Sequence, residues 1–249
     1  MRTQKTLSSE QVEAFYHDEF VTDQVRQFVH LFEHSADQGM VVDMGGGCGF
    51  FARRLAELTN HPVRVIDMDP ASVQACRVAG LDAVEGDAVH PTISGDEEIV
   101  TFNLILHHLV ADSERSTVLL QSRALALWLP YARAVFVNEY IYESLIGNLS
   151  GWLIYQITKS RFLSAVGQAV SKLVPSLKAN TFGVGVRFRS HKEWRGLFEA
   201  AGYTVANSVI GANEPVSMAR RFLFIKNIRR DSFLLLPTDR VELPISNGN

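Results

Sequence analysis

The chain has 249 residues, of which 47% are hydrophobic, enough to bury one large core and form one α/β domain with an insertion. Its net charge of -3 and pI near 6.2 argue against a nucleic-acid partner, which usually requires a basic face. The two cysteines form no disulfide framework, and neither a signal peptide nor a membrane-spanning apolar run is evident. We therefore expect a cytoplasmic protein without stable membrane insertion.

Residues 1–38 are predicted to form a helical cover. Ser8 or Ser9 can cap a first helix that runs through Phe20, and apolar residues at helical spacing continue to Phe32 before the loop at Gly39.

Strands and helices are then expected to alternate. The predicted strands span 40–43, 63–67, 81–85, 98–103 and 133–139, and the predicted helices span 49–59, 71–79 and 112–128. This alternation is typical of parallel βα units, so residues 39–140 are predicted to form the core of a doubly wound sheet.

A glycine-rich turn follows the first strand. Asp43 ends that strand, and Gly45, Gly46, Gly47 and Gly49 come directly after it. Glycine has no Cβ, so such a turn can adopt positive φ and let a ligand lie close to the backbone. The order strand, glycine loop, helix opens a nucleotide-binding sheet.

Two cofactor classes fit this loop. The pattern Gly47-x-Gly49-x-x-Ala52, with Asp67 twenty residues after Gly47, favours a dinucleotide such as NAD. Asp43, however, would repel a pyrophosphate and attract an ammonium group. S-adenosylmethionine has that ammonium group and no phosphate.

Three motifs resemble those of the class I S-adenosylmethionine-dependent methyltransferases. The first, an acid, one residue and Gly-x-Gly-x-Gly, begins at Asp43. The second, an acid that closes strand two and precedes Asp-Pro, lies in residues 63–70 (VRVIDMDP). The third, Gly-Asp-Ala after a short strand, lies in residues 84–88 (VEGDA). The motifs occur in order at the spacing typical of the family.

The resemblance implies an α/β fold with a mostly parallel seven-stranded sheet whose last strand is antiparallel, and S-adenosylmethionine as the cofactor. It places Asp67 on the ribose hydroxyls and Asp87 on the adenine amino group. The expected cofactor-binding residues lie at strand ends and are Asp43, Gly45, Gly46, Gly47, Gly49, Asp67, Met68, Asp87, Ala88, Asn103 and Leu104. Each motif also has an ordinary interpretation: Asp43 as a helix cap, residues 67–70 as a capped loop, and Gly86-Asp87 as a turn.

Candidate catalytic residues follow strands four and five. His107 and His108 lie in a Leu-His-His-Leu pattern, and Glu139 lies at the tip of strand five. Methyl transfer chiefly requires alignment of acceptor and methyl group, but a hydroxyl acceptor must also lose a proton, for which a neutral histidine is suited. Either histidine could instead cap a helix or pack beneath the cofactor, and Glu139 could be a solvated strand-end acid.

Residues 141–190 are too long for a simple connection and are predicted to form a helical lid insertion. Trp152 and Tyr155 share one helical face, which could cover a hydrophobic acceptor or pack on the domain or a second subunit. Arg187 and Arg189 alternate on an extended run and could bind an anionic group of the acceptor or pair with nearby acids.

The remaining residues are predicted to complete the sheet and form a tail. A helix is expected at 191–201, and strands at 203–210 and 221–226 complete the core within residues 191–230. Residues 231–249 are treated as a C-terminal tail, whose apolar run Phe233 to Leu236 suggests a docked strand or an oligomer contact.

The sequence thus favours a methyltransferase acting on a small or medium hydrophobic molecule, anionic or neutral, most plausibly at oxygen in specialised metabolism. Transfer to carbon or nitrogen uses the same donor site. The alternatives are an NAD-dependent oxidoreductase, for which Tyr155-x-x-x-Lys159 has the required spacing, and a non-catalytic cofactor-binding protein. No metal site is indicated, because the adjacent histidines lack a third spaced ligand. A homodimer is one explanation of the apolar insertion and tail.

Overall fold

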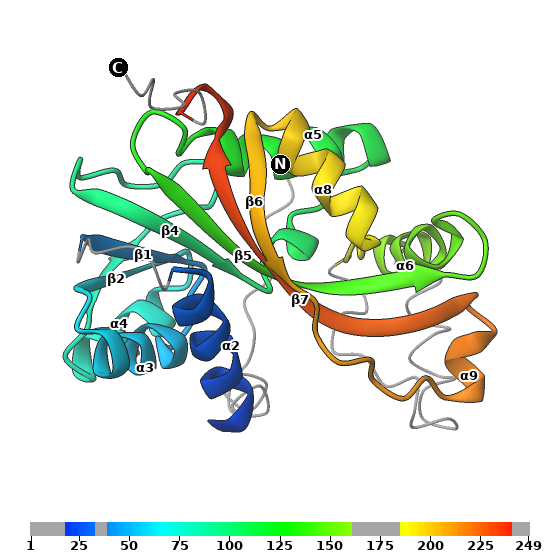
Figure 1. The fold of residues 1–249 in the computed structure, drawn as a ribbon, viewed down its shortest axis with the longest axis horizontal. Coiled ribbons are helices and arrows are strands. Elements are labelled where there is room, and N and C mark those ends of the chain that lie inside the picture. The colour runs from blue at the N-terminus through cyan, green and yellow to red at the C-terminus, as the bar shows by residue number, and fades with distance from the viewer. Residues whose placement is uncertain (1–17, 33–38, 161–184, 241–249) are drawn as a thin grey trace, which may run out of the picture.

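The computed structural model describes residues 18–32, 39–160 and 185–240. Its centre is a seven-stranded sheet with the order β3-β2-β1-β4-β5-β7-β6 (Figure 1). The strands are β1 (Met40–Met44), β2 (Val63–Asp67), β3 (Asp82–Glu85), β4 (Glu97–Asn103), β5 (Ala134–Ser144), β6 (Tyr203–Val209) and β7 (Ile225–Pro237). The first five are parallel, and β7 is antiparallel to both β5 and β6. The predicted doubly wound, mostly parallel α/β fold is confirmed.

Helices cover both faces of the sheet, with α2, α3 and α4 below it and α5 and α8 above it in Figure 1. The α-helices are α2 (Asp18–Leu31), α3 (Phe50–Thr59), α4 (Pro70–Val78), α5 (Glu114–Ala126), α6 (Leu149–Lys159), α8 (His191–Ala200) and the short α9 (Met218–Arg221); short 3₁₀ helices are η1 (Leu106–His108) and η3 (Thr238–Arg240). Two of these helices begin at N-terminal caps: Asp69 caps α4 ahead of Pro70, and Ser190 and Glu193 form a capping box on α8.

Alternating residues of the central strands pack into two separate hydrophobic cores, one on each face of the sheet. Val42 and Val100 point to the core with α5 and α8, whereas their neighbours Val41 and Ile99 point to the core with α2, α3 and α4. Strands that are buried on both faces read as continuous apolar runs. The parallel arrangement brings the carboxyl ends of β1, β2, β3 and β4 to one edge, the position where open α/β sheets bind ligands.

Helix α2 packs against the sheet and contains the second of the two helical runs predicted in residues 1–38. The Gln24 amide donates to Asn138 Oδ1 on β5 (3.0 Å), and Ser232 Oγ on β7 donates to Gln27 Oε1 (2.6 Å). These polar contacts fix α2 across β5 and β7. Residues 1–17, including the predicted Ser8 or Ser9 cap, lie outside the described residues.

The last strand lies later in the chain than predicted. Residues 221–226 were expected to form it, but Arg221 ends α9 and β7 begins only at Ile225. The run Phe233 to Leu236, assigned to a tail from residue 231, lies near the C-terminal end of β7 between β5 and β6, so the docked-strand alternative is confirmed. Phe233 and Leu235 join one core while Leu234 and Leu236 pack against the other, which explains four consecutive apolar residues.

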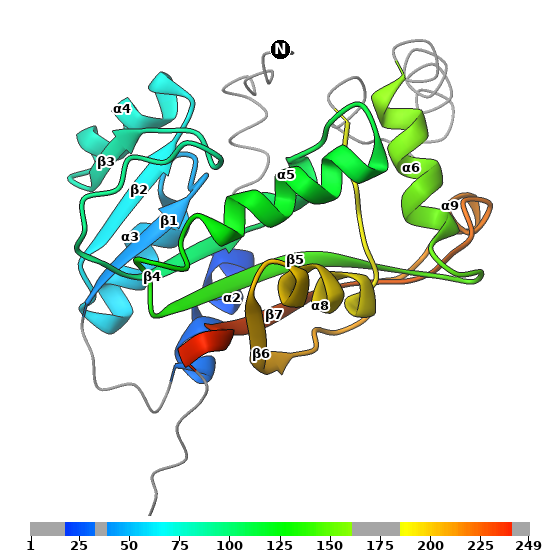
Figure 2. The same ribbon diagram turned by 90° about the horizontal axis from the view of Figure 1, so that it is seen from above.

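Strand β5 also continues past its predicted end at residue 139 and reaches Ser144. It pairs with β7 along this extension, and the two strands project together beyond the ends of β1 and β4 (Figures 1 and 2). Of the predicted insertion, the structure describes residues 141–160, including α6, and 185–190; residues 161–184 lie outside the described part. None of the helices in the described residues is long and apolar enough to cross a bilayer.

Candidate functional site

Asp43 lies at the end of β1 and is fully buried. Its Oδ1 accepts hydrogen bonds from Thr101 Oγ1 (2.8 Å) and Asn103 Nδ2 (3.1 Å), both on β4. Its Oδ2 is buried and has no hydrogen-bond partner among the described residues. Burial raises the pKa of Asp43 to about 6, although the two hydrogen bonds oppose the shift. A cation beside Oδ2 would favour the ionised form.

Asn103 places a second unpartnered acceptor at the same strand edge. Its amide nitrogen is used by Asp43, while its Oδ1 is buried and has no partner within the described residues. Leu104 follows with φ of 54°, a left-handed conformation that non-glycine residues seldom adopt outside constrained sites. The tips of β1 and β4 thus hold two linked side chains, each with a free acceptor oxygen.

The glycine loop lies against these groups. A Cβ on Gly46 would collide with the Asp43 carboxylate, so this position must be glycine for the backbone to pass. Gly47 has φ of 54°, and a Cβ there would meet nothing within 4 Å. Gly45 and Gly49 also have positive φ. The loop is therefore closed on the Asp43 side and open at Gly47.

Asp67 and Asp87 lie at the ends of β2 and β3. Asp67 accepts hydrogen bonds from the backbone N–H groups of Gly47 (2.8 Å) and Asp69 (2.8 Å), which fix the carboxylate beside the loop. Burial raises its pKa, with the backbone donors acting in the opposite direction. Asp87 accepts from the backbone of Val89 (2.9 Å). Both carboxylates retain lone pairs for ligand hydroxyl or amino groups.

Apolar surface accompanies these carboxylates. The Met68 side chain is 41% exposed next to Asp67, whereas Ala88 is buried next to Asp87. The structure thus brings all the predicted cofactor-binding residues to one edge of the sheet. It adds Thr101, which sequence reasoning missed, although its place two residues before Asn103 on one strand face was a usable signal.

His107, in η1, and Glu139, in β5, form a buried pair. His107 Nδ1 lies 2.7 Å from Glu139 Oε2, and the His107 backbone N–H reaches Oε1 at 3.3 Å. Both side chains are almost fully buried. A carboxylate at Nδ1 fixes the ring with Nδ1 protonated, so that Nε2, which makes no hydrogen bond among the described residues, is the accepting nitrogen. The solvated strand-end interpretation of Glu139 is therefore wrong.

Aromatic rings pack around His107. Phe188 stacks on it at 4.8 Å, and His108 lies at 4.2 Å. Tyr140 meets His107 edge-on at 6.1 Å, and Tyr142 stacks on Phe188 at 4.2 Å. Burial, with a contribution from His107, holds the pKa of His108 well below its usual value, so His108 is neutral at physiological pH. Sequence reasoning missed Phe188 and both tyrosines, because only tertiary contacts bring them to the histidine.

Arg187 and Arg189 are not free for an acceptor. Glu114 at the start of α5 bridges both guanidinium groups at 2.9 Å each. Arg187 also pairs with Glu193 (3.0 Å), and Arg189 donates twice to Gln121 Oε1 (3.1 and 2.8 Å). Both arginines are almost fully buried, so they are internal partners of acids, the other role considered for them.

The two residues of α6 that were predicted to contact the substrate, Trp152 and Tyr155, lie in different environments. Tyr155 is buried, and its hydroxyl donates to the Ala111 carbonyl (2.7 Å), while Lys159 Nζ donates to the Asp112 carbonyl (2.7 Å). The Tyr-x-x-x-Lys pair thus anchors α6 to the loop that precedes α5. Trp152 is 43% exposed and stays a candidate acceptor contact.

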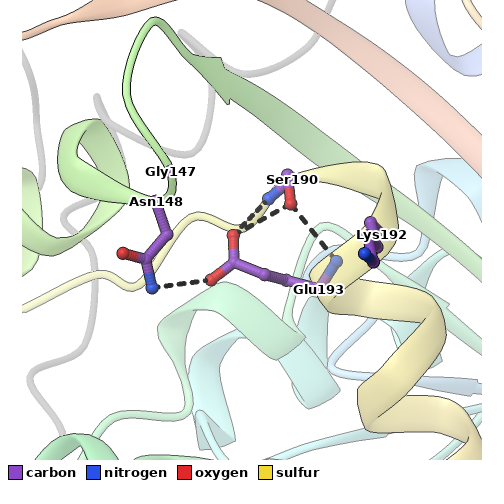
Figure 3. A pocket seen from close by; sticks show the side chains of 5 residues that line it. All are labelled: Gly147, Asn148, Ser190, Lys192 and Glu193. Carbon is purple, nitrogen blue, oxygen red and sulfur yellow. Dashed lines mark hydrogen bonds between the residues drawn. The ribbon is translucent and has the colours of Figure 1, made fainter.

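A surface hollow lies between the N-terminal ends of α6 and α8 (Figure 3), lined by Gly147, Asn148, Ser190, Lys192 and Glu193. Its acid, Glu193, is occupied by the α8 capping box and by Asn148 Nδ2 at 3.3 Å. We therefore place the candidate site at the strand ends, where acceptor atoms lack partners. In the described part of the chain, no cluster of three or more His, Cys, Asp or Glu side chains could hold a metal ion.

Solved methyltransferases share this fold. A geranyl diphosphate methyltransferase in complex with S-adenosylmethionine is 11% identical, with a TM-score of 0.57 over 92% of this chain and 89% of that chain. The magnesium protoporphyrin IX methyltransferase of Synechocystis with bound S-adenosylhomocysteine is 13% identical, with a TM-score of 0.53 over 94% and 90%.

A third similar structure, mitomycin 7-O-methyltransferase, is 15% identical and has a TM-score of 0.52 over 87% of this chain and 53% of that chain. The sequence matches no family model and no curated protein. The similarity is thus one of fold: the chain has the architecture of the class I methyltransferases.

Proposed function

We propose that the protein is an S-adenosylmethionine-dependent methyltransferase that acts on a small or medium hydrophobic acceptor. The observation that carries this proposal is the pair of buried, unpartnered acceptor oxygens on Asp43 and Asn103 beside the glycine loop. An uncompensated buried acceptor is costly, and an ammonium group of the donor would supply hydrogen bonds and charge to both. A pyrophosphate would add negative charge to a site that already disfavours it.

The residues along the strand edge would hold the rest of the donor. Asp67 would accept from the ribose hydroxyls, because its carboxylate is already oriented by the backbone of Gly47 and Asp69. Asp87 would bind the adenine amino group, with Met68 as an apolar contact for the ring. When bound, S-adenosylmethionine supplies a methyl group activated by the sulfonium.

The His107–Glu139 pair supports O-methylation as the finer assignment. His107 Nε2 would take the proton of an acceptor hydroxyl, while Glu139 holds the ring and stabilises the imidazolium that forms. Phe188 fixes the ring plane by stacking. Carbon and nitrogen acceptors use the same donor site and are the alternative assignment. An NAD-dependent oxidoreductase is disfavoured because Tyr155 and Lys159 are both bound to backbone carbonyls.

Transfer of radiolabelled methyl from S-adenosylmethionine to a panel of phenols, carboxylic acids and amines tests the function. We expect His107→Gln to lower kcat by about 10²- to 10⁴-fold, since that range is typical for the loss of a general base. Its affinity for S-adenosylhomocysteine should not change.

His108→Gln is the matched control, because His108 lies in the same motif but does not contact Glu139. We expect it to retain most of the activity. Full activity of His107→Gln would refute the base assignment while leaving the donor site intact. Absence of transfer to every acceptor class, together with NADH-dependent turnover, would refute the methyltransferase itself.

A further inference from the structure

Arg230 lies on β7 directly opposite Tyr140 of β5 in the antiparallel register. Residues opposite each other on neighbouring strands project to the same face of the sheet. On that face the Arg230 guanidinium stacks over the ring of Phe20 in α2, with 3.8 Å between the guanidinium carbon and the ring centroid. The Arg230 side chain thus reaches from β7 to α2.

The donors of Arg230 are not used within the described residues. Its Nη1 is buried and has no hydrogen-bond partner, and no ion pair involves this side chain. Its neighbour Arg229, in contrast, pairs with Asp231 at 3.0 Å and Glu143 at 3.2 Å.

Stacking on Phe20 engages only the face of the guanidinium. The N–H donors lie in the plane of the group and point outward from its edge, so the stack orients them without satisfying them. Leaving a buried donor unpaired costs about 1–3 kcal/mol, more for a charged group. A planar oxyanion can accept two parallel hydrogen bonds from this edge and neutralise the charge.

The position of Arg230 relates it to the candidate base. Tyr140 is its cross-strand neighbour, and the Tyr140 ring lies edge-on to His107 at 6.1 Å. Burial raises the pKa of Tyr140, so this ring stays neutral and offers an apolar surface with one hydroxyl. Arg230 and His107 are therefore both neighbours of one aromatic residue, Tyr140.

We infer that Arg230 binds an anionic group of the methyl acceptor, a carboxylate or another planar oxyanion, while the acceptor hydroxyl faces His107 across Tyr140. The inference rests on the proposed function and specifies its substrate class. It transfers the role first considered for Arg187 and Arg189, whose donors are occupied, to an arginine whose donors are free. An acidic hydroxyaryl compound has both features.

Matched acceptor pairs test the inference: 4-hydroxybenzoate with 4-hydroxybenzamide, and 4-hydroxycinnamate with its amide. Binding of each to the protein saturated with S-adenosylhomocysteine is measured by calorimetry, and methyl transfer is measured with S-adenosylmethionine. We expect an acid to bind at least tenfold more tightly than its amide. Arg230→Met should abolish that preference by weakening the acid about 10- to 100-fold and leaving the amide unchanged.

Two variants make the result specific. Arg221→Met removes an exposed arginine near the start of β7 and should keep the preference for the acid. Arg230→Lys keeps the charge without the planar fork and should retain part of it. Binding of S-adenosylhomocysteine by every variant shows that each is folded and that the donor site is intact.

Equal binding of acid and amide by the wild type, or an acid preference that survives in Arg230→Met, would overturn the inference. So would failure of every acid in the panel to bind. In each of these cases, intact binding of S-adenosylhomocysteine would leave the proposed function standing. Loss of that binding in the wild type would refute the function itself.

Discussion

At the scale of single residues, the site depends on groups that the fold leaves unsatisfied. Asp43 Oδ2, Asn103 Oδ1 and Arg230 Nη1 are buried without partners in the described part of the chain. Buried polar groups are otherwise almost always hydrogen-bonded, so each of these atoms needs an explanation. Two lie beside the glycine loop, and the third belongs to the residue opposite Tyr140 on β7. This distribution is consistent with the proposed cationic donor group and anionic acceptor group.

Asp43 should destabilise the ligand-free protein at neutral pH. Burial raises its pKa to about 6 from 3.8, so the folded state binds the proton more tightly than the unfolded state does. The charged form therefore reduces stability, fully so above pH 6, and this cost declines as the pH falls from about 6 and is gone below the unfolded-state pKa of 3.8. A shift of about two units corresponds to about 3 kcal/mol.

The variant Asp43→Asn tests this sign. In chemical denaturation at pH 7.5 we expect it to be more stable than the wild type by about 1–3 kcal/mol, with the difference shrinking toward pH 5.5. The same variant should bind S-adenosylhomocysteine at least tenfold more weakly, because the carboxylate charge is lost. A less stable variant at pH 7.5, or a difference independent of pH, would contradict the assignment.

The sequence located the residues that meet at the ends of β1 to β4, but it did not reveal the surroundings of His107, Arg187 and Arg189. Asp43, the glycines and Asp67 lie in short motifs at the ends of predicted strands. Because these strands are parallel, their carboxyl ends and the motifs that follow them meet at one edge of the sheet. Arg187 and Arg189 were correctly placed on one face of an extended run. Their partners, Glu114 and Gln121, come from a helix about seventy residues earlier, which no local pattern reveals.

At the scale of elements, residues 185–190 hold the candidate base in place. The backbone N–H of Arg187 donates to the His107 carbonyl (2.8 Å), and Arg189 pairs with Ile141 of β5 as a parallel bridge. Between them, Phe188 stacks on the His107 ring. Glu114 fixes this segment through both arginines, and their guanidinium groups outweigh burial and lower its pKa. The segment therefore links α5 to the His107–Glu139 pair.

Glu114→Ala should therefore affect both stability and catalysis. Removing the acid takes the bridging carboxylate from two buried guanidinium groups, although Arg187 keeps Glu193 and Arg189 keeps Gln121. We expect a loss of about 2–3 kcal/mol in the free energy of unfolding. Because Phe188 would lose its fixed position, kcat should fall while affinity for S-adenosylhomocysteine is retained. Denaturation and steady-state kinetics measure the two effects.

Glu57→Ala is the control for that measurement. Glu57 contacts Arg53 and Arg54 on α3, where all three side chains are at least 38% exposed. Pairs of this kind contribute about 0–1 kcal/mol, so neither stability nor kcat should change appreciably. Equal behaviour of the two variants would contradict the role of the buried network.

The ends of elements show why strand β7 was misplaced. The core sheet was predicted to end before residue 231. On that assumption the apolar run from Phe233 to Leu236 could only be placed in a tail. In the structure that run lies between β5 and β6 and is covered on both faces. The extension of β5 was missed for a related reason, since polar Glu139 and Glu143 interrupt the apolar pattern. Both acids are paired internally, with His107 and Arg229.

At the scale of the whole molecule, two parts of the sheet carry different kinds of side chain. The ends of β1 to β4 carry carboxylates and an open glycine loop, whereas the joint extension of β5 and β7 carries aromatic rings and Arg230. The His107–Glu139 pair lies where these two regions meet. This arrangement explains how one fold can position a cationic methyl donor against an acceptor of a different character.

The most direct test of this account is calorimetric titration of the wild type with S-adenosylhomocysteine and, in parallel, with NAD and NADH, with Asp67→Ala as the comparison. We predict micromolar binding of S-adenosylhomocysteine by the wild type, loss of that binding in Asp67→Ala, and no binding of either dinucleotide. Binding of NADH without binding of S-adenosylhomocysteine would contradict the donor site assigned to Asp43, Asn103 and Asp67.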